Sequence, residues 1–564
     1  MNRGKKPWPL AWPVLIGILG VLSLAAGDGA KPLVVEAGKA LEKTTGSPVA
    51  GGWNLWNNGR VSQPVRFLSS GHYAIVVRAW GSPAAGIWPA MALLVDGLPV
   101  KTVTVNRTRP GDDRFELTIE KGTHDIAAAF LNDALIGKED RNLHVARITI
   151  VPLSDGDTPE LSSGTELRAE ADRREQAILA ATGPAIEANR KADAVVRVVD
   201  AAGKPLAGAR VLAAQTGHEF LFGGNIFGFD ASGSEALNAL YKRRFAELFN
   251  YATTGFYWAS YEFRRGQPNY AQTDKVVAWC AERGIRVKGH PLLWGDRAGI
   301  PRWSQGQPSP ALRRQRVTDI LTRYHGKIGF WEVVNEPSHQ PEPTIDDPYR
   351  WARQADPSAH LIVNDYMVLA DGAPQFFDLL EKAAHDGVPF DGIGIQAHEP
   401  RTERFPLDRV RAIFDHYATL GKDLHITEFT PASDGAPITG FHPDSVWDEA
   451  AQADYAVKFY RVAFAHPSVR AITWWDLSDR HSWRRGGGLL RADMSPKPAY
   501  KQLEHLIRQE WWTSLSGKTD TSGRYSFRGF RGTYRVTVDV DGTTRSTTFE
   551  LARGHSPEFV VSVR

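Results

Sequence analysis

The sequence predicts a multidomain protein built around a (β/α)8, or TIM, barrel, with an N-terminal β-sandwich and a small split β-sandwich flanking the barrel. Three observations lead to this prediction. The chain has 564 residues, which is too long for one domain. Strand-like runs alternate with helical patterns between residues 220 and 476. The regions on both sides of that alternation contain short strands broken by Gly, Pro and Asp-Gly turns.

The first 30 residues have the pattern of a secretory signal. Arg3, Lys5 and Lys6 precede an apolar run from Leu10 to Ala26, and small residues follow it. The run is also about as long as a short membrane span, so a retained anchor is the alternative. In both cases we expect the rest of the chain to be exported, either secreted or periplasmic. It would contact a membrane only if the segment is retained.

Residues 31–153 are expected to form the N-terminal β-sandwich, because alternating runs such as Tyr73–Trp80 are separated by turn signals. This region ends with short acidic and amide residues at 129–133 and 140–145. Such residues can gather oxygen ligands for a hard cation such as calcium. Taken alone, Asn-Asp clusters of this kind are usually turns.

Residues 154–192 are expected to be a linker with one charged helix. The strand-like runs at 195–200 and 209–213 predict a short hairpin around a turn at Gly203. Similar strands return at 517–527 and 532–538. Together the two pieces, 194–215 and 512–564, resemble one carboxypeptidase-regulatory-like β-sandwich. We therefore expect the barrel, residues 216–511, to be inserted into a split domain.

Eight strand-like runs are predicted inside the inserted region. They are 220–224, 251–255, 286–293, 329–335, 361–365, 392–396, 424–428 and 471–476. Polar residues gather where six of these runs end, at 289–294, 335–336, 364–366, 396–398, 427–428 and 474–476. In a (β/α)8 barrel the carboxyl ends of the strands form the active site. Six polar strand ends in register are hard to explain by core packing alone.

Two of these strand ends carry a glutamate, Glu336 on the fourth run and Glu428 on the seventh. Strands three apart in an eight-stranded barrel face each other across its mouth, so the two carboxyls can flank one bond. A pair of carboxyls is what hydrolysis of a glycosidic bond requires. A separation of about 5–5.5 Å would give retention of configuration, and about 6.5–9.5 Å would give inversion.

The same motifs resemble glycoside hydrolase family 10, the endo-β-1,4-xylanases, over about residues 220–508. The similarity rests on Trp-Glu-Val-Val-Asn-Glu-Pro, Ile-Thr-Glu, Gly-His-x-Leu-x-Trp, Asn-Asp-Tyr and Gln-x-His. It implies a retaining enzyme with Glu336 as general acid/base and Glu428 as nucleophile, and no cofactor for catalysis. It also implies a set of substrate-binding residues: His290, Trp294, Asn335, Tyr366, Gln396, His398, Trp475 and Trp483.

The N-terminal region resembles the calcium-dependent xylan-binding carbohydrate modules. The matching pieces are Ile87-Trp88-Pro89, Val95-Asp96-Gly97, Phe-x-Asn-Asp and Asp-Arg-Asn-Leu. In those modules the ion bridges protein oxygens and sugar hydroxyls. The resemblance therefore implies calcium in this domain, with Asp133 and Asp140 as candidate ligands.

One segment departs from the family pattern. After its second strand the family has Glu-Asn-x-x-Lys, which grips the sugar, whereas this chain has Thr253-Thr254-Gly255-Phe256-Tyr257. Xylan is the expected partner, but the same chemistry on another β-glycan, or a non-hydrolytic glycan-binding protein with a degenerate barrel, stays open. A net charge of +3 with interspersed signs gives no indication of nucleic-acid binding.

Overall fold

A computed structural model describes residues 31–153, 157–399, 401–440, 445–553 and 558–563. The predicted signal or anchor, residues 1–30, lies outside these ranges. The chain divides into two compact units, residues 1–173 and 174–564, which are described separately. Within the described ranges, none of the helices combines the length and the apolar character that crossing a membrane requires.

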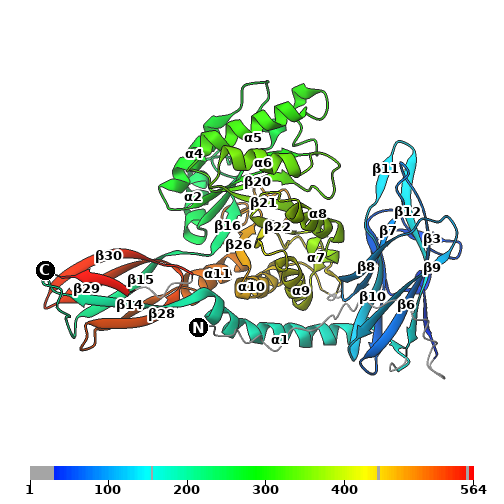
Figure 1. Cartoon of the computed structure of the whole chain (residues 1–564), viewed down its shortest axis with the longest axis horizontal. Helices are drawn as coiled ribbons and strands as arrows, with labels where there is room; N and C mark the ends of the chain where they lie inside the picture. The colour runs from blue at the N-terminus through cyan, green and yellow to red at the C-terminus, as the bar shows by residue number, and fades with distance from the viewer. Residues whose placement is uncertain (1–30, 154–156, 400, 441–444, 554–557, 564) are drawn as a thin grey trace. The chain divides into compact units, whose positions relative to one another are not determined.

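The N-terminal unit is a β-sandwich, as the sequence predicts. One sheet has the order β3-β4-β12-β6-β9, with β1 and β11 paired to β12, and the other has the order β13-β5-β10-β7-β8, with β2 paired to β5 (Figure 1). The inward side chains of both sheets, among them Phe67, Ile75, Leu93 and Ile148, form one buried apolar core. The strands are β1 (Leu33–Glu36), β2 (Glu42–Lys43), β3 (Ser47–Val49), β4 (Gly52–Leu55), β5 (Gly59–Phe67), β6 (Gly71–Ser82), β7 (Ala90–Val95), β8 (Leu98–Thr104), β9 (Gly111–Ile119), β10 (Gly122–Phe130), β11 (Ala134–Ile136), β12 (Glu139–Pro152) and β13 (Glu160–Leu161).

The second unit contains the predicted barrel. All its strands are parallel, in the order β18-β17-β16-β26-β24-β22-β21-β20, and pairing of β18 with β20 closes the ring. The strands are β16 (Leu221–Asn225), β17 (Tyr251–Gly255), β18 (Arg286–His290), β20 (Phe330–Asn335), β21 (His360–Asp365), β22 (Gly392–Ala397), β24 (Asp423–Phe429) and β26 (Val469–Trp474), and the short β19 (Leu293–Trp294) extends the third predicted run. Each predicted run therefore contributes to the barrel.

Helices cover the outside of the barrel and connect its strands. The longer ones are α2 (Glu235–Leu248), α4 (Tyr270–Ala281), α5 (Pro310–Tyr324), α6 (Asp346–Ala355), α8 (Pro374–His385), α9 (Leu407–Ala418), α10 (Glu449–Ala465) and α11 (Pro498–His505) (Figure 1). The barrel strands are apolar and buried on both faces, as parallel strands between helices must be. Because the strands are parallel, their carboxyl ends all lie at the same end of the barrel.

The split β-sandwich is also present. Each of its two sheets combines strands from both predicted pieces, in the orders β28-β14-β31 and β27-β15-β29-β30 (Figure 1). These strands are β14 (Lys191–Val199), β15 (Arg210–His218), β27 (Ser514–Lys518), β28 (Arg524–Phe530), β29 (Gly532–Val540), β30 (Thr543–Leu551) and β31 (Glu558–Ser562). The helix α1 (Gly164–Arg190) precedes them.

The predicted hairpin at 194–213 is wrong. The strands β14 and β15 belong to different sheets and pair with strands from the C-terminal piece instead of with each other. The reason is packing. Val196 and Val198 from β14 and Val211 and Ala213 from β15 are buried in one common core, so the two strands face each other across it. The turn between them therefore crosses from one sheet to the other.

Candidate active site

The two glutamates lie at the end of the barrel where the strands finish. Glu336 follows β20 directly, and its φ of 56° places it in the left-handed region. That conformation is uncommon for a residue with a side chain, and strained residues of this kind cluster at functional sites. Glu428 is the penultimate residue of β24 and is only 5% exposed. Its neighbour β22 carries Gln396 and is followed by His398, so the predicted residues share one end of the barrel.

The carboxyl of Glu336 is held by two donors. The indole Nε1 of Trp294 donates to Oε2 at 3.0 Å, and the amide Nε2 of Gln396 donates to Oε1 at 3.0 Å. Burial nevertheless raises the pKa of Glu336 to about 7, and the charge of Asp365 adds to this effect. Near neutral pH this carboxyl is therefore divided between its protonated and ionised forms, which is the range in which a general acid can work.

The carboxyl of Glu428 lies deeper. The amide of Asn364 donates to its Oε1 at 3.1 Å, and Nε2 of His398 lies 3.6 Å from its Oε2. Burial, followed by the charges of Glu332 and Glu336, raises the pKa of Glu428 well above its ordinary value. Burial also lowers the pKa of His398 to about 3, so that imidazole is neutral.

Two short chains of hydrogen bonds connect the neighbourhoods of the two carboxyls. Gln396 donates to Glu336, while its Oε1 accepts from Nε2 of His398 at 3.0 Å. On the other side, Asn364 donates both to Glu428 and, at 2.8 Å, to Oδ1 of Asn335. Hydrogen-bonded groups therefore lie between the two carboxyls, and the charge of Glu336 raises the pKa of Glu428. Because the two carboxyls of this couple interact, its titration belongs to the pair.

Both ring nitrogens of His290 have partners. Nδ1 contacts Oε2 of Glu332, and Nε2 lies 3.0 Å from the hydroxyl of Tyr257. Burial lowers the pKa of His290, so the ring is neutral and carries one proton. That proton is assigned to Nδ1, where it donates to the carboxylate, and Nε2 therefore accepts from Tyr257. The side chain that the sequence analysis assigns to sugar binding, His290, is thus already hydrogen-bonded within the protein at both ring nitrogens.

Aromatic side chains surround the couple. The indole of Trp475 is 4% exposed and meets His290 edge to face at 5.2 Å. The indole of Trp483 is 46% exposed, meets His398 at 5.2 Å and lies under the guanidinium of Arg401. Indole faces of this kind suit the apolar faces of sugar rings. The phenol of Tyr366 instead stacks on the ring of His339, with centroids 3.7 Å apart.

Several residues of this centre were missed in the sequence analysis as site residues. Lys288 and Glu332 form an ion pair inside the barrel and are 0% exposed. Part of their signal was visible, because Glu332 is the one charge within an otherwise apolar strand and Lys288 lies between Val287 and Gly289 in another predicted strand. Asn364 lies inside a motif that was recognised without assigning this residue a role. Tyr257 was noted only as a departure, and no pattern in the sequence linked it to His290.

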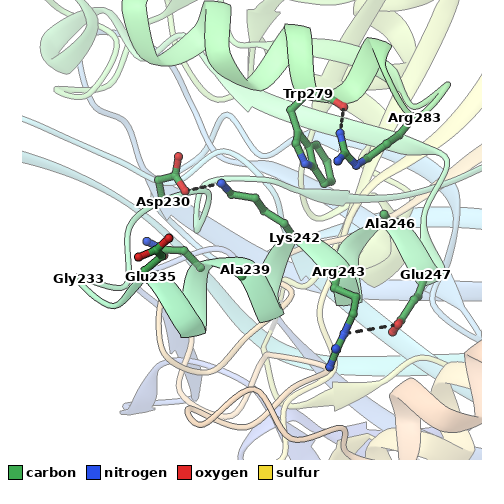
Figure 2. Close-up of a pocket in the computed structure, with 11 residues that line it drawn as sticks. Asp230, Gly233, Glu235, Ala239, Lys242, Arg243, Ala246, Glu247, Trp279 and Arg283 are labelled. Atoms are coloured by element: carbon green, nitrogen blue, oxygen red, sulfur yellow. Dashed lines mark hydrogen bonds and ion pairs between the residues drawn. The ribbon is translucent and has the colours of Figure 1, made fainter.

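One hollow of the second unit lies away from this centre, on the outside of the barrel between α2 and α4. It has a volume of about 840 Å³ (Figure 2). Four of its charged groups form ion pairs: Lys242 with Asp230 and Arg243 with Glu247. The guanidinium of Arg283 covers the indole of Trp279 at 4.6 Å. No strand-end residue lines this hollow, and we assign it no chemistry.

The N-terminal unit holds the predicted cation ligands. Oδ1 of Asp133 is buried and lacks a hydrogen-bond partner among the described residues. Burial raises the pKa of Asp133, and the neighbouring charge of Asp140 raises it further. Oδ2 of Asp140 accepts only an uncharged donor, Nδ2 of Asn142, at 2.8 Å. An orphaned carboxylate oxygen beside a second carboxylate fits a hard cation such as calcium.

Comparison with protein families gives two matches. Residues 217–506, just over half of the 564 residues, match the family model of glycosyl hydrolase family 10. Residues 74–160 match that of a Ca-dependent, xylan-binding carbohydrate-binding module.

The chain is also similar to individual proteins. Anti-sigma-I factor RsgI6 of Acetivibrio thermocellus is 31% identical over 382 residues, which is 65% of this chain and 47% of that protein. Endo-1,4-beta-xylanase 2 of Arabidopsis thaliana is 30% identical over 377 residues, 63% of this chain and 33% of that protein. The chain therefore spans less than half the length of these two relatives. Xylanase 10B from Thermotoga petrophila RKU-1, solved in complex with xylobiose, has 23% identity and a TM-score of 0.45, covering 52% of this chain and 95% of that one.

Proposed function

The chain belongs to glycosyl hydrolase family 10, and from this premise we propose that it is a retaining endo-β-1,4-glycanase that hydrolyses xylan. The observation that carries the proposal is the linked pair of carboxyls, Glu336 and Glu428, at the strand ends of the barrel. Two carboxyls, one protonated and one ionised, supply the acid and the nucleophile of this reaction.

In the proposed mechanism, one oxygen of ionised Glu428 attacks the anomeric carbon of the sugar. As that bond forms, the glycosidic bond breaks, and Glu336 gives its proton to the departing oxygen. Glu336 is then ionised and takes a proton from water, and the resulting hydroxide attacks the same carbon and releases Glu428. The active form of the couple therefore has its proton on Glu336.

Similarity to this family is not sufficient to infer hydrolytic activity, because one relative is named an anti-sigma-I factor. A non-hydrolytic glycan-binding protein therefore stays as the second candidate. The presence of both carboxyls, each with hydrogen-bond donors, favours hydrolysis.

The proposal is tested by the release of reducing sugars from xylan, arabinoxylan and mixed-linkage β-glucan. The matched blank is the isosteric variant Glu428→Gln, which keeps the shape of the site and removes the nucleophile. We expect the wild type to exceed the blank on xylan. Release equal to the blank on all three glycans, together with retained xylan binding, would establish the binding protein instead.

The phenol of Tyr257 is expected to weaken sugar binding. We predict that Tyr257→Phe lowers KM for an aryl β-xylobioside by about 2- to 10-fold, because a sugar hydroxyl can then donate to Nε2 of His290. This range corresponds to one net hydrogen bond. The control is Tyr460→Phe, which removes a buried hydroxyl on α10 that has no partner among the described residues. A rise in KM for Tyr257→Phe would mean that the phenol itself binds the sugar.

For the N-terminal unit we propose a calcium-dependent xylan-binding function, with Asp133 and Asp140 among the ligands. The ion would supply open coordination positions for sugar hydroxyls, while these carboxylates hold it. We expect EGTA, or Asp133→Asn, to weaken binding of the inactive Glu428→Gln chain to insoluble xylan by about tenfold or more. Asp112→Asn, at a carboxylate that pairs with Arg78 elsewhere in the sandwich, should leave binding unchanged. Equal binding with calcium and with EGTA would argue against the ion.

We also propose that the protein is exported, with residues 1–30 as the signal or anchor. The support for this proposal is the charged, apolar and small-residue pattern of that segment. Mass spectrometry of the N-terminus of protein recovered outside the cytoplasm tests it.

A further inference from the structure

A complete ion pair is buried directly beside the candidate nucleophile. The ammonium of Lys288 on β18 contacts Oε1 of Glu332 on β20, and both side chains are 0% exposed. A carboxylate oxygen of Glu332 lies within 4.8 Å of one on Glu428, and a ring nitrogen of His290 lies within the same distance of both. The nucleophile therefore faces a second carboxylate at close range in a water-poor interior.

Such an arrangement opposes ionisation of Glu428. Burying one carboxylate is already costly, and a second negative charge nearby adds repulsion that water does not screen. Although burial works against it, the charge of Lys288 and the hydrogen bond from His290 hold the pKa of Glu332 at about 2, so this carboxyl stays ionised. Its repulsion on Glu428 is therefore present at every pH at which the protein would work.

Of the described groups named below as neighbours of Glu428, one carries a full positive charge. The strand β18 contributes two neighbours of Glu428, Lys288 and His290, of which His290 is neutral. The remaining neighbours are Glu332 and Glu336 from β20, Asn364 from β21, Tyr257 after β17 and His398 after β22. Of these, the two glutamates are acidic, Asn364 and Tyr257 are uncharged, and His398 is neutral. Among these described neighbours, Lys288 is the one that lowers the cost of a negative charge on Glu428 through its own charge.

We propose that Lys288 is a positioning residue for the nucleophile: its ammonium offsets the charge of Glu332, so that Glu428 can ionise beside it. This inference rests on the proposed function, in which Glu428 attacks the sugar. Glu332 in turn fixes the proton of His290 on Nδ1. Glu332 thus orients the ring of His290, and because Lys288 balances its charge, the pair adds no net negative charge beside Glu428.

A purely structural pair would behave differently. Replacing a buried ion pair by neutral residues of similar size often leaves stability unchanged or increased, and it would not affect how the site titrates. The side chains of His290, Glu332 and Glu428 are all of types that can bind a metal. The negative charge of Glu332 does not need a metal to neutralise it, because the Lys288 ammonium already contacts this carboxylate.

The expected results follow from charge. In the wild type the acid limb of kcat/KM reports the proton that must leave the couple before Glu428 can attack. Lys288→Met removes a positive charge, so this limb should move up by about 1 pH unit or more, with a tenfold loss of kcat/KM on its acidic side. Glu332→Gln should move it down. In Lys288→Arg the positive charge is kept, and in the double variant Lys288→Met/Glu332→Gln both charges are removed. In both variants the midpoint of the acid limb should lie within about half a pH unit of the wild-type midpoint.

Lys497→Met is the matched control. Lys497 is also buried, with 1% side-chain exposure, and pairs with a carboxylate, Asp479. This variant loses a comparable ion pair without changing the charge that faces Glu428, so its acid limb should stay in place. An unmoved limb in Lys288→Met, shifts of the same sign in Lys288→Met and Glu332→Gln, or an equal shift in Lys497→Met would each overturn the proposal.

A second measurement separates this inference from the proposed function. The carboxyl of Glu428 can be titrated by ¹³C NMR of carboxyl-labelled protein without substrate, with its signal assigned by its loss in Glu428→Gln. The midpoint should rise in Lys288→Met and fall in Glu332→Gln, whether or not any glycan is hydrolysed. Failure of hydrolysis with these shifts present would remove the function but keep the electrostatic role. Hydrolysis without these shifts would keep the proposed function and overturn the electrostatic role of Lys288.

Discussion

We expect Glu428→Ala to lower kcat on xylan by roughly 10⁴-fold or more, because no other group of the site is placed to form the covalent bond to the sugar. The network around it should survive, since Asn364 keeps its hydrogen bond to Asn335. Replacing a buried carboxylate that faces Glu332 by a neutral residue also removes repulsion. The melting temperature of the isosteric Glu428→Gln variant should therefore not fall below that of the wild type.

Rescue by azide identifies the role of Glu428. In Glu428→Ala the small anion can enter the space left by the carboxylate and attack the anomeric carbon from the nucleophile's side. With an activated aryl β-xylobioside, the product should be the α-glycosyl azide, and the rate should rise with azide concentration. Glu428→Gln, which leaves no such space, is the matched control and should show no rescue. A β-glycosyl azide from Glu428→Ala would assign the nucleophile to another residue.

We expect Glu336→Ala to lower kcat on xylan by about 10²- to 10⁴-fold, the range that general acid catalysis contributes. The loss should depend on the leaving group. A 2,4-dinitrophenyl glycoside needs no proton to depart, so formation of the covalent intermediate should stay near the wild-type rate, whereas its breakdown should be slow. Azide should speed that breakdown and give the β-glycosyl azide. Equal losses on activated and unactivated substrates would contradict a role in proton donation.

The pH profile gives an independent check on Glu336. Its pKa is raised to about 7, chiefly by burial, and it must be protonated to act as the acid. As the pH rises through about 7 the proton is lost, so wild-type kcat/KM should fall tenfold per pH unit above that value. Glu336→Gln cannot titrate and should lose this alkaline limb. Glu262→Gln changes a carboxyl that instead accepts from Trp258 and Gly266, and it should keep the limb.

The order of the parts and the kind of chemistry could be predicted from the sequence. Strand periodicity located all eight barrel strands, because buried parallel strands are continuous apolar runs that end at polar residues. Since parallel strands end at one side, the placement of Glu336 and Glu428 together follows from counting strands. The strand positions and the polar residues at the strand ends could be predicted from local patterns, because each depends on residues that are close in the chain.

Tertiary structure alone decided how the groups affect one another. Three contacts join residues from different strands: the ion pair of Lys288 with Glu332, the hydrogen bond of Tyr257 with His290, and the hydrogen bonds that Gln396 and Asn364 donate to the two carboxyls of the catalytic pair. Tertiary structure also decided the pairing in the split sandwich, where the two strands of the predicted hairpin lie in different sheets. Pairing across strands and the loss of water around a charge depend on distances in space, and a local sequence pattern carries no information about either. The sequence therefore determined which groups this protein brings to its site, and the fold determined which of them hold a proton and which are already engaged.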